Sequence, residues 1–234
     1  MVALARAAGP NAVHIALTQS MADDLRRVTP EISRTVVVGN AALIDKSLLD
    51  LPVKADSAEL VLGHMSDLTE AKGIGEVVDL AVKLKEAGVH ARLILGGPIV
   101  SGVTREHLDR AERELGELFE YRGVLAGESK RRFYDDITHF VLPSREEAVP
   151  LVLYEAMAAG VVCAATRQGS VAEQLENTPC MLADSAESFV EEVFPTLSRM
   201  SVTAAASEKC KRAYIDALAQ SQEQLELLVE LLKG

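Results

Sequence analysis

The strongest constraint on the fold is a regular alternation of short apolar runs with longer segments of helical periodicity. Between residues 59 and 183, runs such as "ELVLGH" (59–64), "ARLILGG" (91–97) and "THFVLP" (138–143) each precede a segment with apolar residues every three or four positions. Near-continuous apolar runs indicate strands that are covered on both faces. The alternation therefore predicts repeated βαβ units and an α/β fold with a Rossmann-like, doubly wound parallel sheet.

The expected helices follow the strands closely. Gly88 is predicted to end the first helix, and Thr104 is the predicted N-cap of the second. From Ser185 onward the pattern is helical, and Pro195 is expected to break or kink it before a long last helix. The predicted helices are 73–88, 104–118, 128–136, 150–160, 170–176 and about 202–233, and the further strands are 119–125 and 161–166.

The first fifty residues differ from this pattern. "HIALT" (14–18), "QSMADDLRRV" (19–28) and "RTVVVGN" (34–40) predict a single strand–helix–strand piece, and "DLPVKADS" (50–57) predicts a polar linker. One such piece buries too little apolar surface to stand alone. The sequence therefore predicts three parts: a remnant of a second domain plus linker at residues 1–50, the Rossmann-like domain at 51–200, and a C-terminal helix at 201–234.

Charge and cysteine content argue against several classes of function. The net charge is −11 without a basic stripe, which argues against nucleic-acid binding and against broad attachment to anionic membranes. Three separated cysteines without a CxxC pair argue against a zinc site or a disulfide framework, and favour small buried hydrophobes in a reducing compartment. The N-terminus is weak as a signal peptide and no run has the roughly eighteen apolar residues of a membrane span. The predicted localisation is cytoplasmic, with peripheral association at a membrane left open.

Ligands of doubly wound sheets bind beyond the carboxyl ends of the strands, so the segments after the strands carry the functional interpretation. The strand "THFVLP" is followed by "SREEAV" and then by a helix. Pro150 fits the first helical position because its ring fixes a helical φ and its missing N–H has no partner there. The N–H groups of Val149, Leu151 and Val152 are then expected to face the ligand, where a helix N-terminus attracts phosphate.

Two glutamates lie beside this helix start. Glu147 precedes the helix and can hold sugar hydroxyls, whereas Glu155 lies about one and a half turns inside it and can accept two hydrogen bonds from a vicinal diol such as a ribose. The alternative for Glu155 is an ordinary solvated helix position, and Glu146 is interpreted as solvated. After the first strand, Lys72 can reach a phosphate and Gly73 permits close backbone approach, the alternative being an exposed lysine beside a helix-starting glycine.

The segment "PSREEAVPLVLYEAMAAGVVCAATRQGSVAE" resembles the donor-binding segment of the retaining glycosyltransferases of family four, which have the GT-B architecture. Glu147 and Glu155 match the two glutamates of the family pattern, and Gly169 with Glu173 match its Gly-x-x-x-Glu turn. "LGHMSDLTEAKGIGEVVDLAVKLKEAG" looks like the family's first strand and Lys-Gly turn, and "YRGVLAGESKRRFYDDITHFVLPS" is similar to its base-binding loop and next strand. The resemblance covers about residues 59–183 and implies the C-terminal donor-binding half of a GT-B fold.

The resemblance implies an enzyme that transfers a hexose from a nucleoside diphosphate sugar to a sugar or glycan acceptor, with retention of configuration and without a metal or cofactor. Glu147 near the reacting carbon and Lys72 at the diphosphate are the implied catalytic residues. The implied donor-binding residues are Glu155 at the ribose, Leu151 and Val152 at phosphate, Val124 at the base, and Gly63 and His64 at the end of the first strand. His64 stands where many members have arginine, and Ala148, Val149 and Pro150 stand where many have Gly-Phe-Gly.

The family normally carries an N-terminal acceptor domain, of which residues 1–50 resemble only the last strand–helix–strand. The expected partners are therefore a nucleotide sugar, an acceptor, and a missing acceptor domain or second polypeptide, with little transfer by this chain alone. Partial exposure is expected for the last-helix residues Leu225, Leu228, Val229, Leu231 and Leu232. The alternative function is a non-catalytic nucleotide-sugar binding or scaffolding module. An unrelated dinucleotide enzyme is disfavoured because no GxGxxG follows the first strand.

Overall fold

The computed structural model describes residues 12–30, 34–57 and 59–233, which divide into two compact units. The larger unit is Asp45–Ala213, and the smaller joins the described residues up to Ile44 with those from Tyr214 onward. Residues 1–11 of the predicted N-terminal remnant lie outside the described residues.

The larger unit is built on a six-stranded sheet in which every neighbouring pair of strands is parallel. Its strands are β3 (Leu60–Met65), β4 (Ala91–Gly96), β5 (Phe119–Tyr121), β6 (His139–Leu142), β7 (Val162–Thr166) and β8 (Met181–Ala183). The spatial order β5-β4-β3-β6-β7-β8 reverses direction between β3 and β6. This is the order of a doubly wound nucleotide-binding domain, and ligands of such domains bind at the reversal. The predicted fold class is confirmed.

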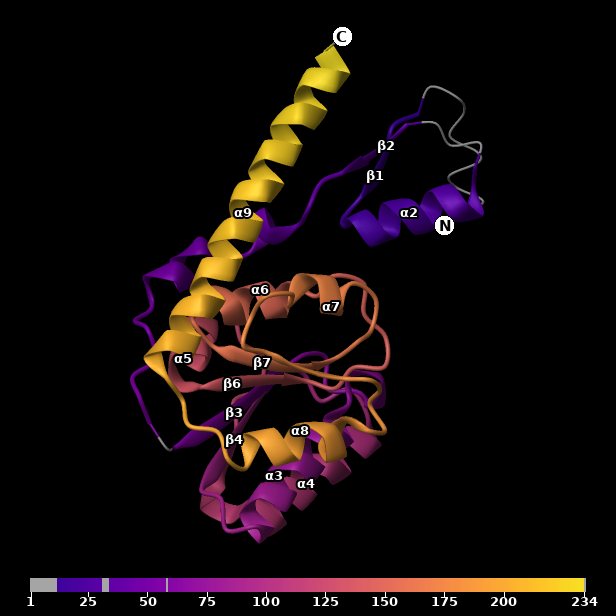
Figure 1. Ribbon diagram of the computed structural model, residues 1–234. Helices are drawn as coiled ribbons and strands as arrows, with labels where there is room; N and C mark the ends of the chain where they lie inside the picture. The colour runs from indigo at the N-terminus through magenta and orange to yellow at the C-terminus, as the bar shows by residue number, and fades with distance from the viewer. Residues whose placement is uncertain (1–11, 31–33, 58, 234) are drawn as a thin grey trace. The chain divides into compact units, whose positions relative to one another are not determined.

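Helices cover both faces of this sheet. Figure 1 shows α5, α6 and α7 on one face and α3, α4 and α8 on the other. Their bounds are α3 (Ile74–Glu86), α4 (Gly102–Leu115), α5 (Glu128–Asp136), α6 (Leu151–Ala158), α7 (Val171–Gln174) and α8 (Phe189–Leu197), and the long last helix is α9 (Ala204–Lys233). Because both faces are covered, all six residues of β3 are buried, which explains why its sequence is apolar apart from His64.

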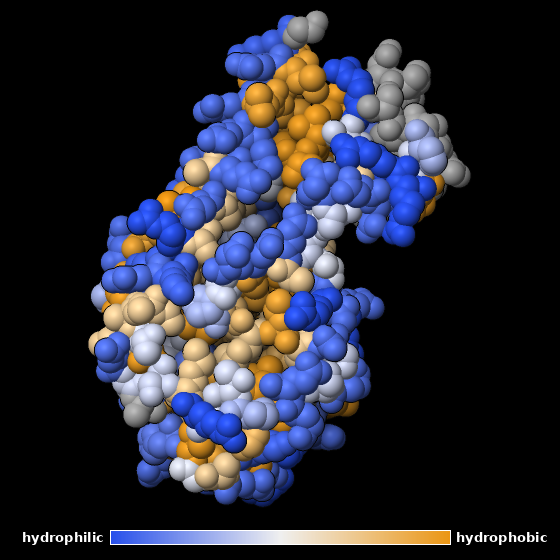
Figure 2. All heavy atoms as spheres, in the orientation of Figure 1, coloured by the Kyte–Doolittle hydropathy of each residue, from blue (hydrophilic) through white to orange (hydrophobic). Residues whose placement is uncertain are grey.

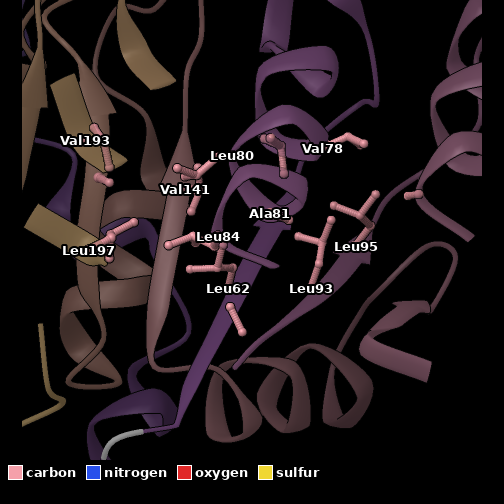
Figure 3. Packing of buried hydrophobic residues seen from close by; sticks show 14 of the residues in the cluster. Leu62, Val78, Leu80, Ala81, Leu84, Leu93, Leu95, Val141, Val193 and Leu197 are labelled. Carbon is pink, nitrogen blue, oxygen red and sulfur yellow. The ribbon is translucent and has the colours of Figure 1, made fainter. Parts of the chain in front are cut away.

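A hydrophobic cluster fills the space between the sheet and the layer of α3, α4 and α8 (Figure 3). Leu62 of β3, Leu93 of β4 and Val141 of β6 face Leu84 and the other apolar residues of α3. The apolar periodicity of the predicted helix 73–88 identifies one face of α3, and each residue of that face is fully buried: Ile74, Val77, Val78, Ala81 and Leu84. Burial of one such side chain contributes about 1.5–3 kcal/mol, so the cluster holds the strand ends in fixed positions.

The smaller unit contains β1 (His14–Ala16), α2 (Gln19–Val28) and β2 (Thr35–Val37), with the two strands parallel. The predicted strand–helix–strand piece is confirmed in its element types, although both strands are shorter than expected. The last part of α9 belongs to this unit, where the Gln224 side-chain oxygen accepts a hydrogen bond from the Gly39 amide at 2.9 Å.

The end of α9 carries apolar side chains at its surface, and Figure 2 shows hydrophobic atoms gathered along these turns. Of the five residues expected to be partly exposed, Leu228 is the exception, with 7% exposure. The prediction for that residue is wrong, and helical spacing places Leu228 in the middle of the apolar stripe, between Leu225 and Leu231. The exposed apolar residues here are Leu225, Leu227, Val229, Leu231 and Leu232. Across the described part of the chain, no helix is long and apolar enough to cross a membrane.

Two local predictions are corrected by the structure. The N-cap of α4 is Ser101, three residues before the predicted Thr104, and its hydroxyl accepts from the Thr104 amide. Thr104 is buried instead, and its hydroxyl donates to the carbonyl of Leu68. The predicted linker is part of the larger unit, in which Lys54 is buried and Ser57 pairs with Val202.

The cysteines are free thiols that lie mostly in the interior. Cys163 and Cys210 are buried, as expected of small hydrophobes, whereas Cys180 is half-buried. The Cys163 amide donates to the Cys180 sulfur at 3.1 Å, so residues that are distant in sequence meet beside the start of β7.

Candidate functional site

The candidate site lies at the sheet edge where the strand order reverses. β3 ends at Met65 and β6 ends at Leu142, and the two strands are parallel neighbours. Their carboxyl ends therefore open at the same edge of the sheet. The loop after β3 carries Lys72 and the loop after β6 carries Glu147, so the topology brings together two predicted residues that are 75 positions apart.

Lys72 and Glu147 form an ion pair at this edge. The Lys72 ammonium lies 2.7 Å from the Glu147 carboxylate and also donates to the carbonyl of Glu146 at 3.3 Å. The Lys72 side chain is 31% exposed and that of Glu147 only 10%. A mostly enclosed carboxylate thus fixes an accessible ammonium, and a charge-assisted hydrogen bond of this kind is both short and oriented. The arrangement can place a positive charge against a phosphate and a carboxylate beside a sugar.

The backbone of Gly73 lets the two loops approach. Its φ of 74° lies in the left-handed region, and a Cβ built there would lie 2.2 Å from the carbonyl oxygen of Pro143. Only glycine satisfies both conditions. A hydrogen bond between the two loops stabilises this approach: the amide of Arg145 donates to the carbonyl of Ala71 at 2.8 Å. The Arg145 guanidinium adds two hydrogen bonds to Glu76, at 2.6 and 3.3 Å.

A third loop packs against the backbone of Glu147 and Ala148. Gly169, in the loop after β7, has a φ of 55°, and a Cβ there would lie 2.2 Å from the carbonyl oxygen of Glu147. The next amide, that of Ser170, donates to the carbonyl of Ala148 at 2.9 Å. The loops after β3, β6 and β7 are therefore packed together, which holds the Glu147 backbone in one place.

The helix that follows Glu147 begins at this edge. Pro150 is the N-cap of α6 with φ −69° and ψ 121°, so the predicted first helical position is wrong by one residue and Leu151 occupies it. The φ of proline suits both the N-cap and the first helical position, but the extended ψ of Pro150 is that of an N-cap residue. The amides of Leu151 and Val152 lie in the first turn of α6, where helix geometry offers no carbonyl four residues back. Such amides form an anion-binding end.

Glu155 is buried rather than solvated, so the alternative that it is an ordinary solvated residue is wrong. It is 5% exposed, and each carboxylate oxygen has a donor. The ammonium of Lys130 lies 2.5 Å from Oε1, and the Tyr134 hydroxyl donates to Oε2 at 2.9 Å. Glu146, by contrast, is exposed, as predicted.

Tyr134 donates a hydrogen bond through its hydroxyl, and its backbone carbonyl accepts one from Lys54. Burial, with the Glu155 charge as a further cause, raises the pKa of Tyr134 well above its usual value, so the hydroxyl keeps its proton. The ammonium of Lys54 donates to the carbonyls of Tyr134 and Asp135, at 2.8 and 2.7 Å, and so satisfies the C-terminal end of α5. Burial lowers the pKa of Lys54 to about 8.

Gly63 and His64 lie inside β3 and face the protein interior. A Cβ on Gly63 would lie 2.6 Å from Ile137, so the missing side chain allows the end of α5 to pack on the sheet. His64 is fully buried, with Nδ1 2.8 Å from the carbonyl of Val141 and Nε2 2.7 Å from the Ser66 hydroxyl. Because a carbonyl only accepts, Nδ1 carries the proton and Nε2 accepts from Ser66. Burial lowers the pKa of His64 to about 4, so the ring is neutral near pH 7.

Val124 follows β5, the edge strand of the sheet, and is 71% exposed. The structure therefore pairs Lys72 with Glu147, places Glu155 on the helix that starts beside them, and leaves Val124 on a separate loop.

The sequence did not identify Lys130, Tyr134 and Arg145 as partners of these residues. For Lys130 and Tyr134 a signal was present, because a spacing of four places both on the same face of the predicted helix 128–136.

Comparison with known proteins gives a consistent result. The family model described as "Glycosyl transferases group 1" matches residues 59–199, more than half of the chain. "Putative glycosyltransferase EpsF" of Bacillus subtilis (strain 168) is 26% identical over 174 residues, which are 69% of this chain and 40% of that protein. "Putative colanic acid biosynthesis glycosyltransferase WcaL" of Escherichia coli (strain K12) is 32% identical over 133 residues, which are 53% of this chain and 32% of that protein.

Among solved structures, Alr3699/HepE of Anabaena in complex with UDP and glucose has a TM-score of 0.69 and 17% identity, covering 93% of this chain and 62% of that one. At this identity the likeness establishes the fold. The chain spans less than half the length of the two curated relatives it matches.

Proposed function

Because this chain belongs to the group 1 glycosyltransferases and supplies their C-terminal, donor-binding domain, we propose that it transfers a hexose from a nucleoside diphosphate sugar to a sugar or glycan acceptor. The proposed reaction retains the anomeric configuration and is independent of metal. The observation that carries the proposal is the Lys72–Glu147 pair at the crossover of β3 and β6, beside the start of α6.

Lys72 and Glu147 are the proposed catalytic residues. When the bond between the sugar and the diphosphate breaks, negative charge builds on the leaving group. Fixed positive charge aimed at that group lowers the barrier, and Lys72 supplies it from a position set by Glu147 and the Gly73 turn. Glu147 is proposed to contact the hexose near the reacting carbon. Its low exposure supports a role in orienting the sugar, because an enclosed carboxylate cannot swing freely.

The other predicted residues are proposed to hold the donor. The first-turn amides of Leu151 and Val152 bind phosphate, and Glu155, about one turn further along α6, receives the ribose diol. Val124 is proposed to lie beside the base, for which its exposure on the loop after β5 is suitable.

For Gly63 and His64 the proposed contribution to donor binding is indirect. His64 acts through the Ser66 hydroxyl at the end of β3, because both of its ring nitrogens have protein partners. Gly63 acts by allowing α5, which carries Lys130 and Tyr134, to pack on the sheet.

The names of similar proteins support the class of donor and acceptor. The Anabaena protein was solved with UDP and glucose, and the Escherichia coli relative is named for colanic acid biosynthesis. We therefore place UDP-hexose first among the donors to test, and a growing glycan first among the acceptors. An acceptor domain or partner polypeptide completes the proposed assembly, which we place in the cytoplasm, with peripheral contact to a membrane as a further proposal.

Calorimetry with UDP, GDP, ADP and their hexose conjugates, in buffer containing EDTA, tests the donor site. We expect one nucleotide series to bind, and Lys72→Met to weaken the diphosphate by about tenfold while leaving the monophosphate nearly unchanged. Lys83→Met is the matched control, because Lys83 is 32% exposed, is paired with Glu191, and lies in the last turn of α3. Equal loss in both variants, or no binding of any nucleotide, would contradict the proposal.

A further inference from the structure

The Glu155 carboxylate is held by two donors from a single helix. Lys130 and Tyr134 lie four residues apart on α5, and both reach across to Glu155 on α6. The ammonium engages Oε1 at 2.5 Å and the phenol engages Oε2 at 2.9 Å. The side chain of Glu155 is 7% exposed, so the carboxylate cannot turn without losing one of these contacts.

The count of hydrogen-bonding sites on this carboxylate matches one kind of ligand. An ionised carboxylate offers about four lone-pair sites, two on each oxygen. Lys130 and Tyr134 occupy one on each oxygen, which leaves one site per oxygen. Two neighbouring hydroxyls of a ribose can fill these two sites together, whereas a deoxyribose leaves one of them empty.

We propose that Lys130 and Tyr134 are positioning residues that fix the Glu155 carboxylate so that it accepts both hydroxyls of a ribose, and thereby make the site selective for ribonucleotides over deoxyribonucleotides. The inference rests on the proposed role of Glu155 in binding the nucleotide. It adds two residues to that site, which determine how strongly the Glu155 carboxylate discriminates ribose from deoxyribose.

Lys130 has a second effect, because it supplies the counter-charge for an enclosed carboxylate. An unpaired buried charge is strongly unfavourable, and the ammonium compensates it while staying 26% exposed itself. An apolar side chain at position 130 would leave Glu155 without its cation. Arginine at the same position would keep the charge and the hydrogen bond with altered geometry.

Tyr134 supplies direction without charge. Its hydroxyl has one proton and two acceptors nearby, the Glu155 carboxylate at 2.9 Å and the Val152 carbonyl at 3.3 Å. The charged, closer acceptor receives the stronger bond. The Tyr134 ring is fully buried, and the Lys54 ammonium donates to the backbone carbonyl of the same residue. Both the ring and the backbone of Tyr134 are therefore held in place.

The test compares ribose with 2′,3′-dideoxyribose in the same site. Dissociation constants are measured by calorimetry for UDP, GDP and ADP and for their 2′,3′-dideoxy forms, and the selectivity is the ratio of the dideoxy to the ribose value. The variants are Glu155→Gln, Lys130→Met, Lys130→Arg and Tyr134→Phe. Arg132→Met is the control on the same helix, because Arg132 is 73% exposed and pairs with Glu128, one turn away. Unfolding by urea confirms that each variant is folded.

We expect the wild-type protein to prefer the ribose form by about tenfold or more, and Glu155→Gln to lose most of that preference. Lys130→Met and Tyr134→Phe should each reduce the selectivity several-fold while the affinity for the dideoxy form stays within about twofold. Lys130→Arg should recover most of the selectivity, and Arg132→Met should not change it.

The outcomes separate this inference from the proposed function. If selectivity disappears in Glu155→Gln but survives in both Lys130→Met and Tyr134→Phe, the proposed site stands and the positioning role is wrong. If these two variants weaken the ribose and dideoxy forms equally, the residues are merely structural and the inference is also wrong. A wild-type protein that binds nucleotide without ribose selectivity overturns the role of Glu155 together with this inference, and absence of all nucleotide binding overturns the proposed function itself.

Discussion

Gly73 and Gly88 offer a matched pair of substitutions that isolates the packing of the two site loops. Their φ angles are 74° and 76°, so alanine meets the same backbone conformation at both positions. A left-handed conformation costs a non-glycine residue about 1–2 kcal/mol. Alanine also reduces the conformational entropy of the unfolded chain, which offsets about 0.4–1 kcal/mol of this cost. No atom lies within 4 Å of the Cβ position at Gly88. Gly88→Ala should therefore lower the free energy of unfolding by about 1 kcal/mol.

At Gly73 the same substitution also forces the loops apart. The new Cβ would lie 2.2 Å from the Pro143 carbonyl oxygen and 2.8 Å from its carbonyl carbon, both backbone atoms. Moving them breaks the hydrogen bonds that Arg145 and Ser144 make with the carbonyl of Ala71. At about 0.5–1.5 kcal/mol for each bond, the total for Gly73→Ala is roughly 2–4 kcal/mol.

Urea unfolding of the two variants and the wild-type protein, followed by circular dichroism, measures the difference directly. Nucleotide titration of the same samples should show weaker binding for Gly73→Ala only, because Lys72 moves with the loop. Equal destabilisation by both variants would refute the reasoning, since it would mean that the approach of the loops adds nothing to the backbone penalty.

Three further predictions concern titration and thiol access. Burial lowers the pKa of His64 and of His139 to about 4, so the unfolded chain binds more protons than the folded chain between pH 6.5 and 4. The free energy of unfolding should therefore fall as the pH falls through that window. His139→Phe should remove about 2 kcal/mol of the loss between pH 7.5 and 5, as measured by urea unfolding. Burial lowers the pKa of Lys54 to about 8, so above that pH the unfolded chain binds more protons at this position than the folded chain. The free energy of unfolding of the wild-type protein, relative to that of Lys54→Met, should therefore rise by about 1 kcal/mol from pH 8 to 9. Cys180 is the half-buried thiol, so a disulfide reagent should modify it first in the native protein, with all three reacting in urea; equal native rates would contradict the observed burial.

Most of the sheet was predictable because the central strands β3, β6 and β7 are buried along their length. Six buried residues in β3 produce an apolar run that is visible without any structure. The three-residue strand β8 was missed, since Met181–Ala183 is too short to stand out from the turn before it. The strand order could not be read in the same way, because β3 pairs with β6 although β4 and β5 lie between them in the sequence.

Burial of polar side chains was the hardest property to predict. Lys54 stands in a segment with Pro, Asp and Ser, which is typical of a linker, yet its ammonium satisfies the end of α5. Ser101 and Thr104 are both plausible N-caps from sequence, and only the path of the chain after β4 decides between them. In each case a non-local contact determines the environment of a residue whose local sequence fits another role.

The candidate site shows the same division between local and non-local information in its charges. Glu147 and Glu155 are eight residues apart and lie on one loop and its helix, so the local sequence identifies both. Their cations come from elsewhere, Lys72 from the loop after β3 and Lys130 from α5, at separations of 75 and 25 residues. The strand-end rule predicts the first pairing, because parallel strands share an edge. The second depends on how α5 packs beside α6, and the missing side chain of Gly63 allows α5 to pack on the sheet. A cation for a buried carboxylate is thus required by physical chemistry, while its identity is set by helix packing.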